Sequence, residues 1–368
     1  MAFNHAQGLQ TGETIQFGIE RVERHAVAYQ DVADIGLENG AISLPSLKLD
    51  VGRNSVAGAM TLDKDLLPSG TISFDLPDVA LLAAMAGKKA EGAIKGSAQV
   101  ASADGKIDAK VTATGLIRNQ TIDIQTNVIS DHGAVSIPSL RANIGANTLT
   151  GTLALDKDFL PSGQFSFDFP DIGLLAAFAG QEAQGALKGS AALRSDTGRI
   201  SGTITASGET VTAAGTRIVN PSINLRIADL AAGQLSGHVT ADQIASGANH
   251  LDQLALNVDQ VNQRTNFDLK SQFDGAPMTA KGHLVQENGG LKLSLESFAA
   301  APRKIPVRLS NATDVTIKDG TVTLADLIIE AGKGMITVNG TAGKTMELAA
   351  KIDALPLNLA NTLSPGLD

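Results

Sequence analysis

The sequence contains no cysteine and no tryptophan, and it has one tyrosine among 368 residues. The absence of cysteine excludes disulfides, zinc–thiolate sites and thiol catalysis. No apolar run approaches the roughly 20 residues that span a bilayer, and the opening stretch MAFNHAQGLQTGE lacks the apolar core of a signal peptide. We therefore expect either a cytosolic protein or a segment of a longer protein, and we favour the segment.

Positive charge is also in short supply. The 29 lysines and arginines are outnumbered by 38 acidic residues, which gives a formal net charge of -9, and the basic residues are scattered along the chain. Nucleic-acid binding needs a clustered basic patch, so nucleic acid is not an expected partner.

The sequence does contain a long internal repeat. The stretch LDKDLLPSGTISFDLPDVALLAAMAGKKAEGAIKGSAQV at 62–100 returns 93 residues later at 155–193, with 26 identities in 39 positions. We place repeat units at 41–133 and 134–226, followed by a degenerate copy over 227–368. A fixed period favours a stacked architecture, so we expect residues 1–368 to form one continuous repeat body rather than a globular enzyme.

Between turn signals, apolar residues recur at every second position, which is typical of strands with one apolar face. Pairs such as Asp104-Gly105, His132-Gly133, Asn288-Gly289 and Asp319-Gly320 are hairpin signals because both positions tolerate positive φ. These turns are too short for parallel crossovers, so the strands should form an antiparallel meander. We estimate about seven strands in each unit and assign the chain to the all-β class.

Each unit also contains one segment that is not a strand. The stretches 78–87 and 171–180 follow a proline, begin with an aspartate that can cap a helix and end with a glycine that can close it. We predict short helices at both places. Each helix should press two apolar residues onto the apolar side of the sheet, Leu82 and Met85 in the first copy and Leu175 and Phe178 in the second.

The sequence offers no layer of long helices to cover the apolar face, so the sheet must curl on itself to shield it. Twist and interior glycines such as Gly58, Gly96, Gly151 and Gly202 permit such a curl. The expected result is an elongated, curled antiparallel sheet with an apolar groove and short helices. We expect the groove to be lined by Val56, Met60, Leu62, Ile72, Phe74, Leu76, Leu149, Leu153, Leu155, Phe165, Phe167 and Phe169.

The segments LPDVALLAAMAGKKAEGAIKGSA, FPDIGLLAAFAGQEAQGALKGSA and LPLNLANTLSPGLD resemble the recurring segments of the TamB (translocation and assembly module) family, within the AsmA-like proteins of Gram-negative bacteria. The resemblance implies a β-taco sheet in the periplasm, anchored to the inner membrane. It implies phospholipid acyl chains as ligand, a role in outer-membrane protein assembly or secretion, and docking on the outer-membrane barrel TamA. The anchor and the docking domain are expected in parts missing from this chain.

The residues give no sign of an enzyme. The sequence has no GxSxG motif, phosphate-binding glycine loop or Rossmann fingerprint, so no catalytic or cofactor-binding residue is assigned. The six histidines are dispersed, and no metal site is assigned. Asp63-Lys64-Asp65 and Asp156-Lys157-Asp158 could hold a cation, but their place before Pro-Ser-Gly favours turns.

Two other readings remain. A structural or adhesive secreted β-solenoid would have a solid core and a repeat of 20 to 30 residues per coil. A polysaccharide-processing β-helix enzyme would need clustered carboxylates on one face, which the sequence does not show.

Overall fold

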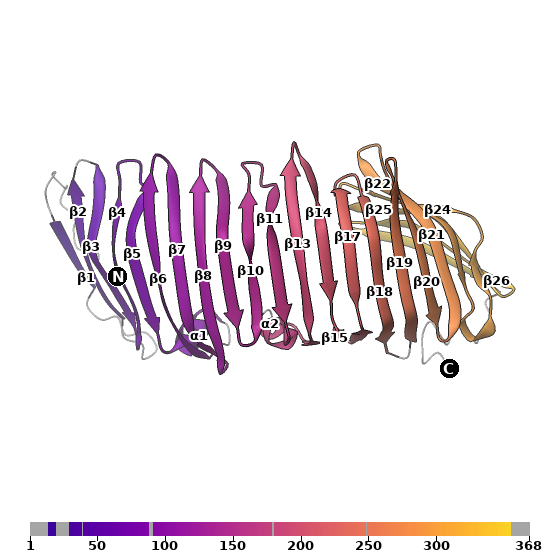
Figure 1. The fold of residues 1–368 in the computed structure, drawn as a ribbon, viewed down its shortest axis with the longest axis horizontal. Helices are drawn as coiled ribbons and strands as arrows, with labels where there is room; N and C mark the ends of the chain where they lie inside the picture. Colours follow the sequence, from indigo (N-terminus) through magenta and orange to yellow (C-terminus); the bar gives the residue numbers. More distant parts are fainter. Residues whose placement is uncertain are drawn as a thin grey trace. The chain divides into compact units, whose positions relative to one another are not determined.

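The computed structural model describes residues 14–19, 29–38, 40–87, 91–178, 180–247 and 249–354. These residues contain 27 strands and two α-helices of seven residues each, so the all-β prediction is confirmed (Figure 1). The chain divides into two compact units, residues 1–165 (unit 1) and 166–368 (unit 2). The boundary falls within one strand, β11, and the two units are described in turn. The expected single continuous body stays a prediction.

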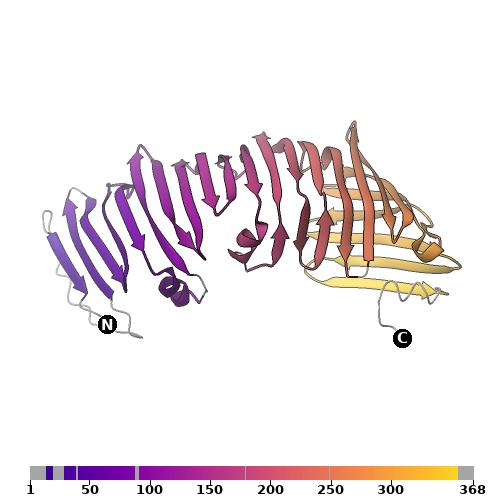
Figure 2. The same cartoon turned by 60° about the horizontal axis from the view of Figure 1, so that its bottom comes forward.

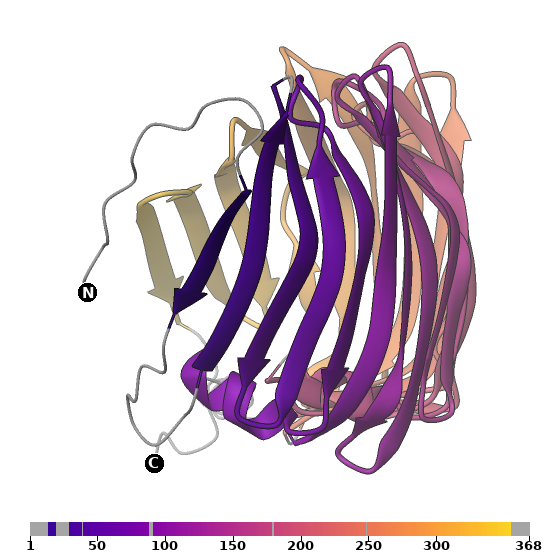
Figure 3. The same ribbon diagram turned by 90° about the vertical axis from the view of Figure 1, so that its left-hand side faces the viewer.

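Unit 1 is a one-layered sheet whose strands bow along their length (Figure 3). Every strand pairing described within it is antiparallel and joins neighbours in the chain. Its elements are β1 (Thr14–Ile19), β2 (Tyr29–Glu38), β3 (Ala41–Val51), β4 (Asn54–Leu62), β5 (Pro68–Leu76), α1 (Val79–Met85), β6 (Gly92–Ala103), β7 (Lys106–Ile117), β8 (Gln120–Asp131), β9 (Ala134–Ile144), β10 (Asn147–Leu155) and the start of β11 (Pro161–Phe169).

Unit 2 is also an antiparallel meander, and its last strands turn back on its earlier ones (Figure 2). After the end of β11, its first half holds α2 (Ile172–Phe178), β12 (Ala183–Gly185), β13 (Leu187–Asp196), β14 (Arg199–Ser207), β15 (Thr210–Ala213), β16 (Thr216–Val219), β17 (Ser222–Asp229), β18 (Gln234–Ser246) and β19 (Asn249–Val261). The second half holds β20 (Arg264–Phe273), β21 (Ala276–Glu287), β22 (Gly290–Ala300), the 3₁₀-helix η1 (Pro302–Lys304), β23 (Val307–Leu309), β24 (Thr313–Lys318), β25 (Thr321–Ala331), β26 (Gly334–Ala342) and β27 (Met346–Asp353).

The meander prediction is therefore confirmed, but neither unit has the seven strands estimated from the sequence. Residues 134–226 contain β9 to β16 and the start of β17, because three long strands are interrupted there, between β12 and β13, β14 and β15, and β16 and β17. Residues 41–133 contain six strands, β3 to β8, and α1. These strands are 9 to 12 residues long, and this length leaves room for only six. The hairpin turns are as expected, since Asp104 and Gly105 have φ of 52° and 77°.

Proline occurs inside β3 and β9, where it would normally cost a hydrogen bond of the sheet. The pairing of β3 with β4 shifts register between Leu44 and Leu47, and Pro45 lies in this irregularity. Pro138 lies at the equivalent shift in β9, between Ile137 and Leu140. A β-bulge leaves a residue outside the regular ladder and bends its strand, so it accommodates the missing N–H.

Both helices lie where the sequence places them, and their bounds are one period of 93 residues apart. The Asp78 carboxylate accepts a hydrogen bond from Leu81 N at 3.2 Å, and Asp171 caps Leu174 N in the same way at 3.2 Å. Gly87 and Gly180 follow the helices with φ of 67° and 69°.

The expected packing of the helices needs correction. Met85 is 55% exposed, and a Cβ placed on Gly52 would lie 2.7 Å from Cδ2 of Leu81. Leu81 therefore covers the β3–β4 turn, while Leu82 and Leu175 are half-buried. In Figure 1, α1 lies at the lower ends of its neighbouring strands, so it borders the rim of the sheet. The side chain of Phe178 lies outside the described residues.

Candidate functional site

The two faces of the unit 1 sheet differ sharply in chemistry. Residues that face each other directly on neighbouring antiparallel strands lie on the same face, so the register defines rows that cross the strands. One such row, which we call apolar row 1, contains only apolar side chains and glycine. Its members, from β3 to β10, are Leu49, Val56, Phe74, Gly96, Ala113, Ile124, Ala142 and Leu149.

The opposite face carries polar rows in the same strands. One of them runs from β5 to β10 through Asp75, Lys95, Thr114, Asp123, Asn143 and Thr148. Another begins with Ser97 and Thr112, whose hydroxyl oxygens are 3.2 Å apart. One face of unit 1 is thus apolar across at least six strands, and the other is polar.

Unit 2 has the same division. Its apolar row 2 crosses eight strands, from β13 to β22, through Gly189, Ala206, Ile223, Val239, Leu256, Leu269, Ala280 and Phe298. The polar row beside it consists of Ser190, Thr205, Asn224, His238, Asn257, Asp268, Lys281 and Ser297. Gly189 and Ala206 lie one period after Gly96 and Ala113, so the two rows use equivalent positions.

Glycine is required in these rows because the neighbouring chain approaches closely. A Cβ on Gly96 would lie 2.1 Å from the carbonyl oxygen of Thr112 and 2.6 Å from Cζ of Phe74. One period later, a Cβ on Gly189 would lie 2.8 Å from Cζ of Phe167. A phenylalanine ring therefore covers a glycine on the next strand in both copies.

All twelve residues predicted to line the groove are half-buried. Val56 and Phe74 face each other, and Leu149 joins them in apolar row 1. In unit 2 the rings of Phe167 and Phe169 stack with centroids 5.0 Å apart. The lining assignment itself stays a prediction, because half-burial shows position and not a ligand.

The predicted lining did not include Leu49 or the residues of apolar row 1 that lie on β6 to β9, of which only Gly96 was singled out, as an interior glycine. Gly96, Ala113, Ile124 and Ala142 are small or lie in the less repetitive part of the unit. Their alternation with polar neighbours was a usable signal, but only the register shows that they join Phe74 to Leu149.

The apolar face of unit 1 is incompletely covered. Among the described apolar residues of unit 1, only Val51 and Ile122 are fully buried, at 9% and 7% exposure. A sheet between two covering layers would bury most of its apolar side chains. The half-buried state of the row follows from the single layer.

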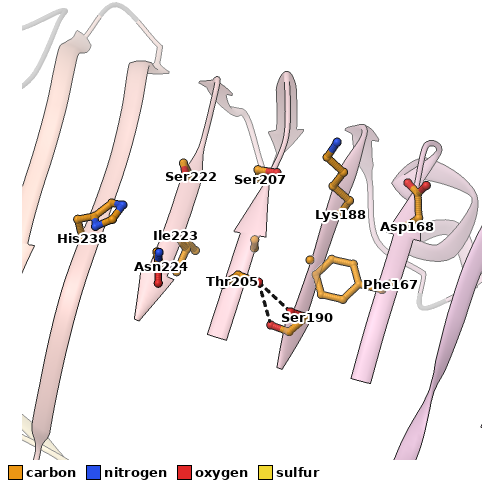
Figure 4. A pocket seen from close by; sticks show the side chains of 12 residues that line it. Phe167, Asp168, Lys188, Ser190, Thr205, Ser207, Ser222, Ile223, Asn224 and His238 are labelled. Atoms are coloured by element: carbon orange, nitrogen blue, oxygen red, sulfur yellow. Dashed lines mark hydrogen bonds between the residues drawn. The ribbon is translucent and has the colours of Figure 1, made fainter. Parts of the chain in front are cut away.

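Shallow depressions lie against the two glycines of the repeat. One of 410 Å³ includes Gly96, Ser97 and Thr112, and its equivalent in unit 2 has 520 Å³ (Figure 4). The second is lined by four members of the polar row and by three of apolar row 2, Gly189, Ala206 and Ile223. Within it, Ser190 Oγ lies 2.8 Å from Thr205 Oγ1. In each depression one serine hydroxyl and one threonine hydroxyl lie within hydrogen-bond distance of each other.

The repeated Asp-Lys-Asp segments form turns, as the sequence favours. Asp63 Oδ1 accepts hydrogen bonds from the backbone N–H groups of Asp65 and Leu67, at 2.8 and 2.9 Å. Asp156 makes the same two bonds, at 2.8 and 2.9 Å. Lys64 Nζ lies 2.7 Å from Asp65 Oδ2, and this hydrogen bond raises the pKa of Lys64.

Three histidines lie beside carboxylates. His132 Nδ1 is 2.6 Å from Asp131, His283 Nδ1 is 2.7 Å from Glu296, and His250 lies 3.4 Å from both Asp252 and Asp274. No group of three or more such residues within the described ranges has an arrangement that could hold a metal ion. His5 and His25 lie outside the described residues.

The two α-helices are short, and the described part of the chain includes no helix with the length and hydropathy of a membrane span. Comparison of the chain with protein-family models, with curated proteins and with solved structures finds no match.

Proposed function

We propose that this chain is a periplasmic segment of a protein that bridges the inner and outer membranes and carries phospholipid along an apolar groove. The observation that carries the proposal is the pair of apolar rows, which cross eight strands in unit 1 and eight in unit 2. The family resemblance of the repeated segments supports the same reading.

The physical argument concerns what such a surface does to water and to lipid. A half-buried apolar strip gains free energy when hydrocarbon replaces the water on it, at about 25 cal/mol per Å². Because the rows run across the strands, an acyl chain can move along each row without crossing a polar strip. The headgroup can stay in water at the open edge of the sheet.

The proposed setting follows from the family resemblance. The protein that contains this segment would be anchored to the inner membrane, contact the outer-membrane barrel TamA through parts outside these 368 residues and support assembly or secretion of outer-membrane proteins. The rival reading as a parallel-stranded solenoid does not fit the antiparallel pairings. A structural scaffold without lipid remains the alternative that the experiment must exclude.

The test places one charge on the predicted groove lining. Phe167→Asp and Leu153→Asp put a carboxylate where an acyl chain would pass, and burying an unpaired charge against hydrocarbon costs several kcal/mol as an order of magnitude. The matched control is Thr205→Asp, which adds the same charge to the polar row. Photo-crosslinking of a phospholipid to the purified chain, and outer-membrane integrity with the full-length parent, are the readouts.

We expect both lining variants to lose crosslinking while Thr205→Asp retains it. Circular dichroism and abundance must be unchanged, so that loss of binding is separated from loss of folding. If a folded Phe167→Asp variant binds lipid and supports the envelope as well as the parent sequence, the proposal of a lipid path is wrong. The structural scaffold without lipid then replaces it.

A further inference from the structure

Two large apolar side chains project from equivalent turns of unit 1. Leu66, in the β4–β5 turn, is 64% exposed, and Phe159, in the β10–β11 turn, is 72% exposed. They are 93 residues apart and occupy the same position of the repeat. Most other apolar residues of these strands are half-buried, so the tips of these two turns stand out.

The backbone holds both side chains outward in an unfavourable conformation. Leu66 and Phe159 have φ of 61° and 59°. Of the sixteen described residues other than glycine with positive φ, these two alone carry a large apolar side chain. Glycine or asparagine fits this region with less strain. A bulky residue in this conformation in both copies is a strained feature of the kind that marks functional positions.

The turns themselves are well defined. The Leu66 N–H donates to the carbonyl of Asp63 at 2.9 Å, and the Phe159 N–H donates to that of Asp156 at 2.9 Å. Together with the carboxylate bonds described above, this fixes the position of each tip. Both turns lie at the upper rim of the sheet in Figure 1, because β4 and β10 run in the same direction.

Six strand spacings separate the two tips. At about 4.8 Å per strand they lie about 29 Å apart on the same rim. Two apolar groups at this separation can reach one extended surface at the same time, and a bivalent contact is stronger than either tip alone.

We propose that the Leu66 and Phe159 turns insert into the surface of a zwitterionic lipid bilayer. The two copies present side chains of different shape, one aliphatic and one aromatic. A fluid hydrocarbon surface accepts both, whereas a shaped protein pocket would distinguish them. Each turn also carries two aspartates and one lysine, a net charge of -1 that does not favour an anionic membrane.

This contact is distinct from the proposed groove, since it uses the rim and not the apolar row. It would place the edge of the sheet at a bilayer surface. The two proposals therefore fail separately. Loss of vesicle binding would leave crosslinking of a single phospholipid intact, and a groove variant such as Phe167→Asp would leave vesicle binding intact.

The first experiment is flotation of the full chain with phosphatidylcholine vesicles. The double variant Leu66→Asn/Phe159→Asn replaces both apolar side chains by asparagine, which tolerates positive φ. Burial of one such side chain contributes roughly 10- to 100-fold in binding, so each single variant should lose about that factor and the double variant more. Met346→Asn removes a side chain that is also 72% exposed, but on strand β27, and should bind like the parent.

The second experiment uses the absence of native tryptophan. Phe159→Trp puts the single indole at a tip, and Leu116→Trp puts it at a 48% exposed position near the opposite rim. On addition of phosphatidylcholine vesicles, we expect a blue shift and quenching by brominated lipid for Phe159→Trp alone. The proposal is overturned if the double Asn variant floats like the parent, if binding requires anionic lipid, or if the indole at position 116 is the one that responds.

Discussion

Asn54 and Asp78 are joined by two reciprocal hydrogen bonds that link the start of β4 to the cap of α1. The Asn54 Nδ2 group donates to the carbonyl oxygen of Asp78, and its Oδ1 accepts from the Asp78 N–H, both at 2.9 Å. Asn54 is only 2% exposed, as is its repeat equivalent Asn147. A single amide side chain thus holds the helix at the rim, in a position that alternation of apolar residues does not reveal.

Replacing Asn54 by alanine should destabilise the protein, because both backbone groups of Asp78 lose their partner in a partly buried place. We expect a loss of about 2–3 kcal/mol in the free energy of unfolding. Urea unfolding measures it. Asn224→Ala, on the exposed polar face, should change stability by less than about 0.5 kcal/mol. Equal losses from the two variants would contradict a special role of the Asn54 clamp.

Gly96→Ala should cost about 3 kcal/mol, because the added methyl group overlaps the carbonyl oxygen of Thr112. Phe74→Leu removes the ring that also crowds this position. The double variant should stay close to Gly96→Ala in stability, since the backbone overlap remains. Full recovery in the double variant, measured by thermal unfolding, would show that the ring and not the backbone sets the requirement for glycine.

Asp63→Ala should loosen the β4–β5 turn, because the N–H groups of Asp65 and Leu67 lose their shared acceptor. The expected loss is about 1 kcal/mol, and Asp63→Asn should lose less because an amide oxygen can still accept. Hydrogen exchange at the Asp65 and Leu67 amides reports the effect directly. Unchanged protection of both amides in Asp63→Ala would argue against the turn as described.

Phe159→Asn should raise the free energy of unfolding by about 1 kcal/mol, because asparagine tolerates positive φ better than phenylalanine. Little packing is lost, since the side chain is 72% exposed. The neighbouring Leu160→Asn removes a half-buried side chain and should destabilise. A decrease in stability for Phe159→Asn, measured by urea unfolding, would mean that the tip packs on its surroundings in solution.

Acid should weaken one cluster of unit 2. Ser294 Oγ donates to Asp314 Oδ1 at 2.6 Å, and this bond, assisted by Lys292, lowers the pKa of Asp314 below its ordinary value of 3.8. The ionised carboxylate therefore stabilises the fold above pH 3.8, and this contribution is lost as the pH falls through the lowered value. Ser294→Ala should raise the pKa of Asp314 toward 3.8, as a carboxyl NMR titration would show. The exposed Ser297→Ala should leave it unchanged.

Much of this fold could be predicted from its sequence because the signals are local and repeated. The hairpin at Asp104-Gly105 and the helix caps at Asp78 and Asp171 depend on residues next to each other in the chain. The two apolar faces follow from alternation within single strands. Duplication strengthened these predictions, since two copies agreed at each place.

The features that could not be predicted depend on contacts between strands. The strand count was wrong in both units because nothing in the sequence fixes where a long strand ends or is interrupted. Met85 was expected on the apolar side, but a seven-residue helix at the strand ends meets the sheet through Leu81 instead. The positive φ and the exposure of Leu66 could not be predicted either, since a turn signal does not say which residue takes positive φ.

The even number of strands in residues 41–133 has a consequence for how such a sheet can grow. With six strands per 93 residues, a strand and its repeat counterpart point the same way, as β4 and β10 do. Adding or deleting one whole copy would change the length of the sheet by about 29 Å and leave every turn on its original edge. A copy with five or seven strands would reverse the two edges and turn the Leu66-type tips to the side of the helices. Because the number of strands is even, the repeat is an interchangeable module. Copies can be added or removed without changing which edge of the sheet carries the Leu66-type turns.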